Sequence, residues 1–147
     1  SEAFVFATRL TRLTRHLNIG GADYAYAKVA EAAPDWSGGT RIGAALTTFL
    51  DTHGRRGLAR GAIIVVVSDG WEIDDPTEVG KAMQRISRLA HHVIWVNPRS
   101  AASEFKPLAG GMAAALPFVD TFLSGHSLRA LEELLEAIRD AGERRRA

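Results

Sequence analysis

The chain has 147 residues, of which 46% are hydrophobic and 24% are charged, with a formal net charge of +1; this is typical of one soluble globular domain. The near-neutral charge argues against nucleic acid as a partner, and the absence of cysteine excludes a disulfide framework, a thiolate zinc site and a cysteine nucleophile. The longest apolar run, residues 62–67, is too short to span a bilayer, and no basic-then-apolar leader opens the chain, so we expect a cytoplasmic protein.

The first third of the chain predicts two strands followed by two helices. Aromatic and β-branched residues alternate with polar ones at residues 3–8 and 10–14, as in strands. Asp23 can cap a helix that ends before Pro34, because proline disfavours helical geometry in the residue before it. After the glycines of "DWSGGTRIGAAL" (residues 35–46), apolar residues at helical spacing predict one buried face: Ile42, Ala45, Leu46, Phe49 and Leu50.

A buried strand and a well-marked helix come next. "GAIIVVVSDG" (residues 61–70) is a continuous β-branched run, typical of a strand covered on both faces in a parallel sheet. "DDPTE" then offers Asp75 as N-cap, Pro76 at the first helical position and Glu78 at the third, an acidic version of the capping box. We expect the following helix to bury Val79, Ala82, Met83, Ile86, Leu89 and Ala90.

The last third predicts two more strands and two helices. "HHVIWVNP" (residues 91–98) is a second buried strand, a short helix is expected around residues 107–115, and a strand at about residues 118–122. Ser127 can cap a final helix with one apolar face, formed by Leu128, Leu131, Leu134, Leu135 and Ile138. We assign residues 1–140 to a single domain and residues 141–147 to a frayed basic tail.

Strands that alternate with helices predict an α/β fold with a doubly wound, mainly parallel sheet flanked by helices, in which ligands bind at the carboxyl ends of the strands. Two polar residues fall there. Asp69 follows the first buried strand, and Thr40 precedes a helix. Taken singly, Asp69 is a turn residue and Thr40 a helix cap. Together, a carboxylate and a hydroxyl on one sheet edge are hard oxygen ligands suited to magnesium.

Several segments carry a resemblance to a known family: "EAFVFATRLTRLT", "DWSGGTRIGAAL", "IIVVVSDGWEIDDP", "RLAHHVIWVNP" and "GMAAALPFVDTFLSGHSLRALEEL". They resemble the von Willebrand factor type A (VWA) domain, and more narrowly its bacterial CoxE-like branch. The resemblance extends to about residue 138. It implies a VWA fold, Rossmann-like in its doubly wound sheet, with a metal-ion-dependent adhesion site built from three loops.

By this resemblance Thr40 stands for the threonine of the second metal loop and Asp69 for the aspartate of the third. The first loop, Asp-x-Ser-x-Ser, is missing from the sequence, as are the central strand and first helix. We therefore expect either a fragment of a longer protein or a truncated sheet, re-paired or completed in a homodimer. In both cases we expect this chain to bind magnesium weakly or not at all. The partner-binding rim around the two ligands comprises Ser37, Gly38, Gly39, Arg41, Ser68, Gly70 and Trp71.

The resemblance implies a non-enzymatic interaction module that binds an acidic side chain of its partner through the metal. CoxE-like proteins are associated with MoxR-type AAA+ ATPases and with maturation of metalloenzymes such as molybdenum-containing carbon monoxide dehydrogenase, which implies an assembly role. One alternative is a magnesium-dependent phosphoryl-transfer or hydrolytic enzyme that uses Asp69. Against it, "SGGTRIG" lacks the lysine of a P-loop and no histidine or cysteine falls near the rim. Another alternative is a metal-free dimerising scaffold.

Overall fold

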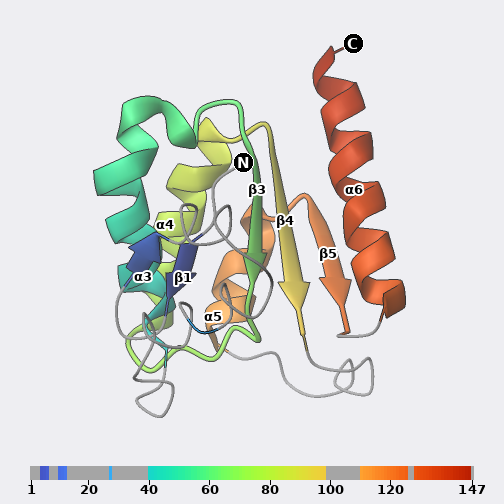
Figure 1. Ribbon diagram of the computed structural model, residues 1–147. Helices are drawn as coiled ribbons and strands as arrows, with labels where there is room; N and C mark the ends of the chain where they lie inside the picture. The colour runs from blue at the N-terminus through green and yellow to red at the C-terminus, as the bar shows by residue number, and fades with distance from the viewer. Residues whose placement is uncertain are drawn as a thin grey trace.

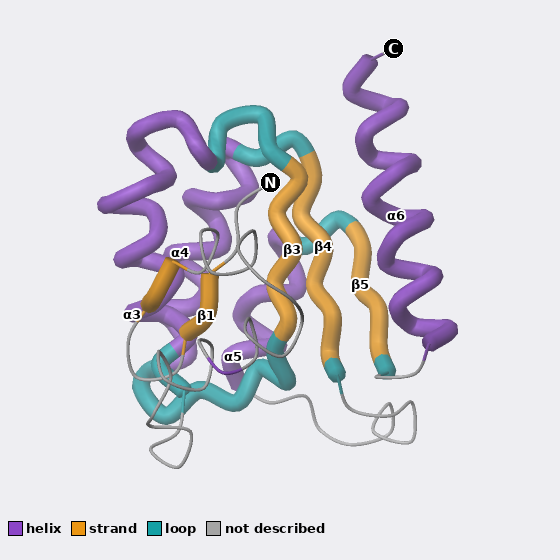
Figure 2. Tube along the Cα trace, in the orientation of Figure 1, coloured by secondary structure: helices purple, strands orange, loops and turns teal. Residues whose placement is uncertain are grey.

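The computed structural model describes residues 4–6, 10–12, 27, 40–98, 110–125 and 128–146. Three strands form a parallel sheet in the order β3-β4-β5, with helices on both of its faces (Figure 1). The expected α/β class is therefore confirmed. Among the described elements, most helices lie on one side of the sheet, and the long helix at the end of the chain lies on the other side (Figure 2).

The sheet consists of β3 (Ile63–Val67), β4 (His92–Asn97) and β5 (Thr121–Ser124). The first two match the buried strands predicted from their β-branched runs. The third begins later than the predicted 118–122, because a 3-10 turn, η4 (Leu116–Phe118), comes before it. Pro117 lies in the first turn of η4, where its fixed φ and missing N–H favour a helical start over a strand.

One face of the sheet packs against three helices, α3 (Ile42–Phe49), α4 (Pro76–Leu89) and α5 (Gly110–Ala115). The side chains of Val66, Val93 and Trp95 face these helices and are buried with them in one apolar cluster. The predicted stripes are confirmed: fully buried or packed against the cluster are Ile42, Leu46, Phe49, Leu50, Val79, Ala82, Met83, Ile86, Leu89 and Ala90. Of the short helix expected at 107–115, residues 107–109 lie outside the described residues.

The other face of the sheet is crossed by α6 (Leu128–Arg146), beneath which Ile94 and Val96 are buried. The predicted apolar face of this helix is wrong in part, because Leu135 is 58% exposed, whereas Ala130 and Ala141 are buried. The frayed tail is also a wrong prediction, since the helix continues to Arg146. Arginines in a last helical turn interact favourably with the helix dipole.

Two short strands lie apart from the main sheet. β1 (Phe4–Phe6) and β2 (Leu10–Arg12) pair with each other in antiparallel fashion. The ring of Phe4 packs edge-on against Phe49, with 5.3 Å between centroids, and contacts His53 of η2 (Leu50–Leu58), the π-helical continuation of α3. Within the described ranges β3 pairs with β4 alone, so the re-pairing expected for a truncated sheet is not seen there. The helix predicted between Asp23 and Pro34 lies outside the described residues, except for Ala27, which is helical.

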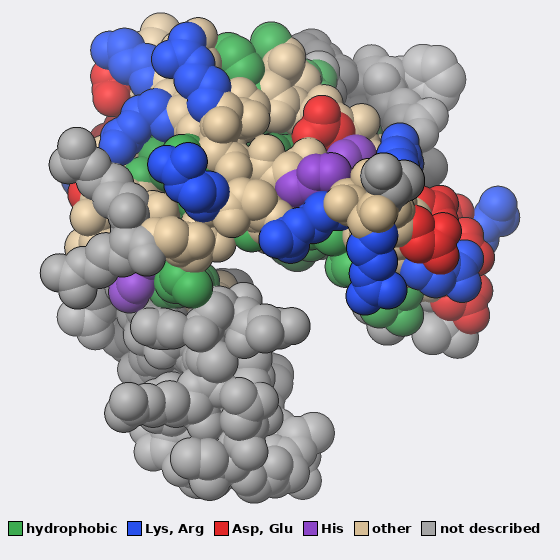
Figure 3. Space-filling view, turned by 90° about the horizontal axis from the view of Figure 1, so that it is seen from above, with side chains coloured by type: hydrophobic (Ala, Val, Ile, Leu, Met, Phe, Trp, Pro, Cys, Tyr) green, Lys and Arg blue, Asp and Glu red, His purple; other side chains and the backbone are tan. Residues whose placement is uncertain are grey.

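The two ends of the sheet differ in charge. Arg60 and Arg88 are exposed where β3 and β4 begin, and the arginines of the last turn of α6 lie at the same end. Figure 3 looks onto this end, where Lys and Arg side chains are spread over the surface. The carboxyl ends of the strands lie at the opposite end, and there the loop after β3 carries Asp69, Glu72, Asp74 and Asp75. Among the described residues, the predicted site is therefore at the end where these acidic side chains gather.

Candidate functional site

Two segments meet at the carboxyl end of β3: residues 40–43, which lead into α3, and residues 68–75, which connect β3 to α4. They contain the described residues of the predicted partner-binding rim, and from here on the name rim means these two segments. The second segment is the loop that runs in Figure 2 from the lower end of β3 beneath the helices to the start of α4. The backbone N–H of Ile73 donates to the carbonyl of Thr40 at 3.3 Å. The two segments are therefore joined directly, although about thirty residues of chain separate them.

The rim loop leaves the sheet through two tight turns. Ser68 donates its N–H to the carbonyl of Val96, continuing the β3-β4 ladder, and its carbonyl accepts from the buried indole of Trp95 at 2.8 Å. The Ser68 hydroxyl accepts from the N–H of Gly70, and the Asp69 carboxylate accepts from the N–H of Trp71 at 3.0 Å. Asp69 is thus a turn residue, which was one of the two roles expected from the sequence. Its side chain is half-buried.

Gly70 fixes the direction of the loop. Its φ is +77°, in the left-handed region that favours glycine. A Cβ at this position would lie 2.5 Å from the Cβ of Met112, and one at Gly111 would lie 2.6 Å from the carbonyl oxygen of Gly70. The backbone of the rim therefore packs directly on α5. Gly70 is buried, so it supports the rim from below and does not present a surface to a partner.

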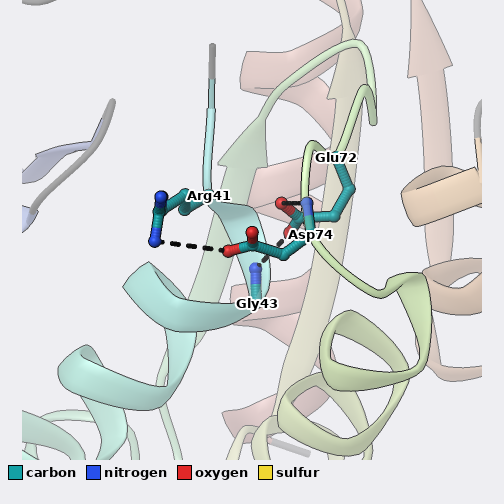
Figure 4. Close-up of polar contacts among 4 residues, drawn as sticks. All are labelled: Arg41, Gly43, Glu72 and Asp74. Atoms are coloured by element: carbon teal, nitrogen blue, oxygen red, sulfur yellow. Dashed lines mark hydrogen bonds and ion pairs between the residues drawn. The ribbon is translucent and has the colours of Figure 1, made fainter. Parts of the chain in front are cut away.

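The start of α3 corrects the prediction that Thr40 caps this helix. The N-cap position is held by Arg41, whose side chain makes no capping bond. The cap comes instead from Glu72, whose Oε2 accepts from the N–H of Gly43 at 2.7 Å, while its Oε1 accepts from the N–H of Asp74 at 3.1 Å (Figure 4). An ion pair of 3.8 Å between Arg41 and Asp74 lies beside these bonds.

The start of α4 follows the sequence-based prediction. Asp75 is the N-cap and accepts from the N–H of Thr77 at 3.0 Å, with Pro76 in the first turn. This hydrogen bond from the Thr77 backbone, with a second one from its hydroxyl, lowers the pKa of Asp75 from its ordinary 3.8. Glu78 does not close the predicted capping box toward Asp75 but pairs with Lys81 at 3.0 Å.

The remaining predicted rim residues differ in exposure. Trp71 is 66% exposed, Arg41 is exposed, and Thr40 and Ser68 are half-buried. Ser37, Gly38 and Gly39 lie outside the described residues. Ile73 also belongs to the rim, although it was not predicted from the sequence; it is 42% exposed, and its N–H bonds the Thr40 backbone. A signal was available, because in "WEIDDP" the isoleucine stands between two acidic residues and outside the apolar runs that mark the buried strands and helix faces.

The family model described as "VWA domain containing CoxE-like protein" matches residues 1–131. The chain belongs to this family. No curated protein and no solved structure matches it. The resemblance found in the sequence is thereby confirmed, and domains of the VWA type mediate protein interactions and are in general not catalytic. In the part of the CoxE-like chain that the structure describes, no helix is long and apolar enough to cross a membrane.

The metal site that the CoxE-like family implies can be tested against the side chains of the rim. Across the described ranges, no three His, Cys, Asp or Glu side chains come together as a metal site. All four rim carboxylates have partners: Asp69, Glu72 and Asp75 accept from backbone N–H groups, and Asp74 pairs with Arg41. A carboxylate from Asp69 and a hydroxyl from Thr40 are donors that magnesium takes, and this ion keeps several waters. The pair therefore fits one part of a water-rich magnesium site.

The histidines of this VWA domain offer no second metal centre among the described residues. His91 and His92 are adjacent, and their Nε2 atoms lie 2.9 Å from different partners, the carbonyl of Ala141 on α6 and the hydroxyl of Thr121 on β5. This agrees with the prediction that neighbours entering a strand point to opposite faces and cannot bind one metal together.

Proposed function

We propose that this CoxE-like VWA domain is a non-enzymatic interaction module that captures a partner protein at the rim. Thr40 and Asp69 contribute a hydroxyl and a carboxylate to a weak magnesium site, which an acidic side chain of the partner and water complete. The partner is a MoxR-type AAA+ ATPase, and the pair acts in metalloenzyme maturation in the cytoplasm. Membership of the CoxE-like family supports this assignment.

One observation carries the proposal most directly: the backbone bond from Ile73 to Thr40 joins the two segments that contain the proposed ligands. Together with the Glu72 bond to Gly43, it places Thr40 and Asp69 on joined segments and not on independent loops. Because Glu72 takes the capping role at α3, the Thr40 hydroxyl is not needed there. A hydroxyl outside the cap and a half-buried carboxylate on the neighbouring segment are both donors that magnesium takes, which supports a shared site.

The apolar side chains of the rim support a protein as the partner. Trp71 and Ile73 are exposed on a loop whose backbone is anchored on α3 and α5. Tryptophan is enriched among the residues that dominate binding energy at protein interfaces. A rigidly held loop also loses little conformational entropy when a partner binds. Bound magnesium would supply a positive charge between the acidic rim and an acidic side chain of the partner.

The test compares Thr40→Ala and Asp69→Ala, singly and together, with two matched controls, Thr48→Ala on the exposed side of α3 and Glu132→Ala on α6. Binding to a purified MoxR-type ATPase is measured by biolayer interferometry with magnesium and with EDTA. We expect the double variant to bind at least about tenfold more weakly, the loss of roughly one good contact, and to lose its magnesium dependence. Both controls should bind as the unsubstituted chain does.

Three results would contradict the proposal. Unchanged magnesium-dependent binding by the double variant would remove Thr40 and Asp69 from the site. Hydrolysis of a phosphoester that depends on Asp69 would favour the enzymatic alternative. A metal-independent dimer in solution, insensitive to both substitutions, would favour the scaffold.

A further inference from the structure

Glu72 connects the two segments of the rim through both oxygens of its carboxylate. Oε2 accepts from the Gly43 N–H on α3, 29 residues earlier in the chain, and Oε1 accepts from the Asp74 N–H of its own loop (Figure 4). The side chain is half-buried. A carboxylate that bonds backbone on two sides fixes both segments at once.

The residue at the N-cap position cannot provide this cap. The side chain at the N-cap position is Arg41, and a guanidinium has only donors, so it cannot accept from the first helical N–H groups. Helix starts leave four such groups without partners, and a carboxylate there is favoured by hydrogen bonding and by the helix dipole. The start of α3 therefore depends on a residue of the loop after β3.

The other two links between the segments are weaker. The bond from Ile73 to Thr40 is longer, at 3.3 Å, and joins neutral groups. The ion pair between Arg41 and Asp74 spans 3.8 Å between side chains that are each about half exposed, a setting in which ion pairs contribute little. The 2.7 Å charge-assisted bond of Glu72 is the shortest of the three and the best shielded from water.

We propose that Glu72 is the positioning residue of the rim: its carboxylate holds residues 40–43 against residues 68–75 and so sets the position of Thr40 relative to Asp69. In this proposal Glu72 acts on the magnesium site through the backbone of the two segments and not as a ligand. The holding role stands on the geometry alone, whereas its consequence for magnesium rests on the proposed function.

Hydrogen exchange of the metal-free chain tests the holding role. In Glu72→Ala we expect the amides of Gly43 and Asp74 to exchange at least tenfold faster by NMR. Glu72→Gln keeps one acceptor oxygen, so it should retain protection at one of the two amides and still fold if the alanine variant does not. Asp74→Ala is the matched control, because it removes the ion pair with Arg41 and leaves both Glu72 bonds. Unchanged protection of Gly43 in both Glu72 variants would overturn the proposal.

Magnesium titration by calorimetry, at a temperature where circular dichroism shows every variant folded, separates positioning from simple stabilisation. A positioning role predicts at least fivefold weaker magnesium binding in Glu72→Ala, an intermediate value in Glu72→Gln and no change in Asp74→Ala. Equal magnesium affinity in all four proteins would overturn the positioning role. If the unsubstituted chain binds no magnesium, the proposed function fails, while the exchange experiment still decides whether Glu72 holds the rim.

Discussion

The helices α3 and α4 begin side by side at the same end of the sheet, yet their first turns are satisfied in different ways. A Cβ added to Gly43 would lie 3.0 Å from the backbone of Glu78, so the two starts are in close contact. α4 takes its cap from Asp75, two residues before the amide that it binds, whereas α3 takes its cap from Glu72, 29 residues after the amide. A cap from nearby sequence makes a helix start independent, and a cap from a distant loop makes it depend on that loop.

The two kinds of cap predict different responses of α3 and α4 to a partner that binds at the rim. The first turn of α4 is capped by Asp75 from the adjoining residue, so we expect it to keep its structure when a partner binds. The start of α3 is coupled through Glu72 to the loop that carries Asp69 and Trp71, so a ligand that displaces this loop also disturbs the first turn of α3. Three experiments test this contrast.

The largest effect on stability is expected from Gly70→Ala, because Gly70 lies in the loop that contains the caps of both helices, Glu72 and Asp75. Overpacking costs about 1–3 kcal/mol and a left-handed non-glycine residue about 1–2 kcal/mol, and the new Cβ would meet Met112 at 2.5 Å. We therefore expect the free energy of unfolding to fall by about 2–4 kcal/mol in urea titrations. Gly57→Ala is the control, because its φ is +107° but nothing lies within 4 Å. Equal losses in the two variants would show that packing on α5 does not hold the loop.

A smaller effect is expected when α3 is given a local cap. Serine in place of Arg41, in the Glu72→Ala background, puts an acceptor at the N-cap position and should restore about 1 kcal/mol of stability. It cannot restore the link to the rim loop, so magnesium binding should remain weak. Calorimetry and urea titration of the double variant measure the two quantities separately. Recovery of magnesium affinity would mean that capping alone, from any source, positions Thr40.

The smallest effect concerns the local cap of α4 and appears only in acid. The pKa of Asp75 is lower in the folded chain than its ordinary 3.8, because the Thr77 amide donates to the ionised carboxylate. The stabilisation is therefore complete above pH 3.8 and is lost as the pH falls through the lowered folded-state pKa. Asp75→Asn keeps a capping oxygen without this titration. Urea midpoints between pH 6 and pH 2 should fall less steeply for Asp75→Asn, and an identical fall in both proteins would contradict the role of Asp75.

Where a signal is local, the sequence was enough to place the elements. The β-branched run at residues 63–67 and the Asp-Pro pair before α4 each act on their own neighbours, and both were placed correctly. The final helix shows the limit of periodicity. Its strongest apolar positions include Leu135, yet the helix buries Ala130 and Ala141, because the sheet decides which side of the helix is covered.

In the candidate site, too, the sequence indicated some residues and could not indicate a contact between distant segments. The resemblance indicated Thr40 and Asp69, and the rim places their segments next to each other through the Ile73 bond. The cap of α3 could not be found from the sequence, since Thr40 stands where a cap is normally read and the real acceptor lies in another loop. Only the folded chain brings Glu72 to Gly43.

The bond from Trp95 to Ser68 has a practical consequence. Trp95 is fully buried and its indole N–H is held at the end of β3, while Trp71, three residues after Ser68, is mostly in water. An indole in an apolar, rigid setting fluoresces at shorter wavelength than a hydrated one. With Trp36 replaced by phenylalanine, the emission of the chain would have a blue component from the interior and a red component from the rim. Quenching by iodide would then report occupation of the rim without any attached dye.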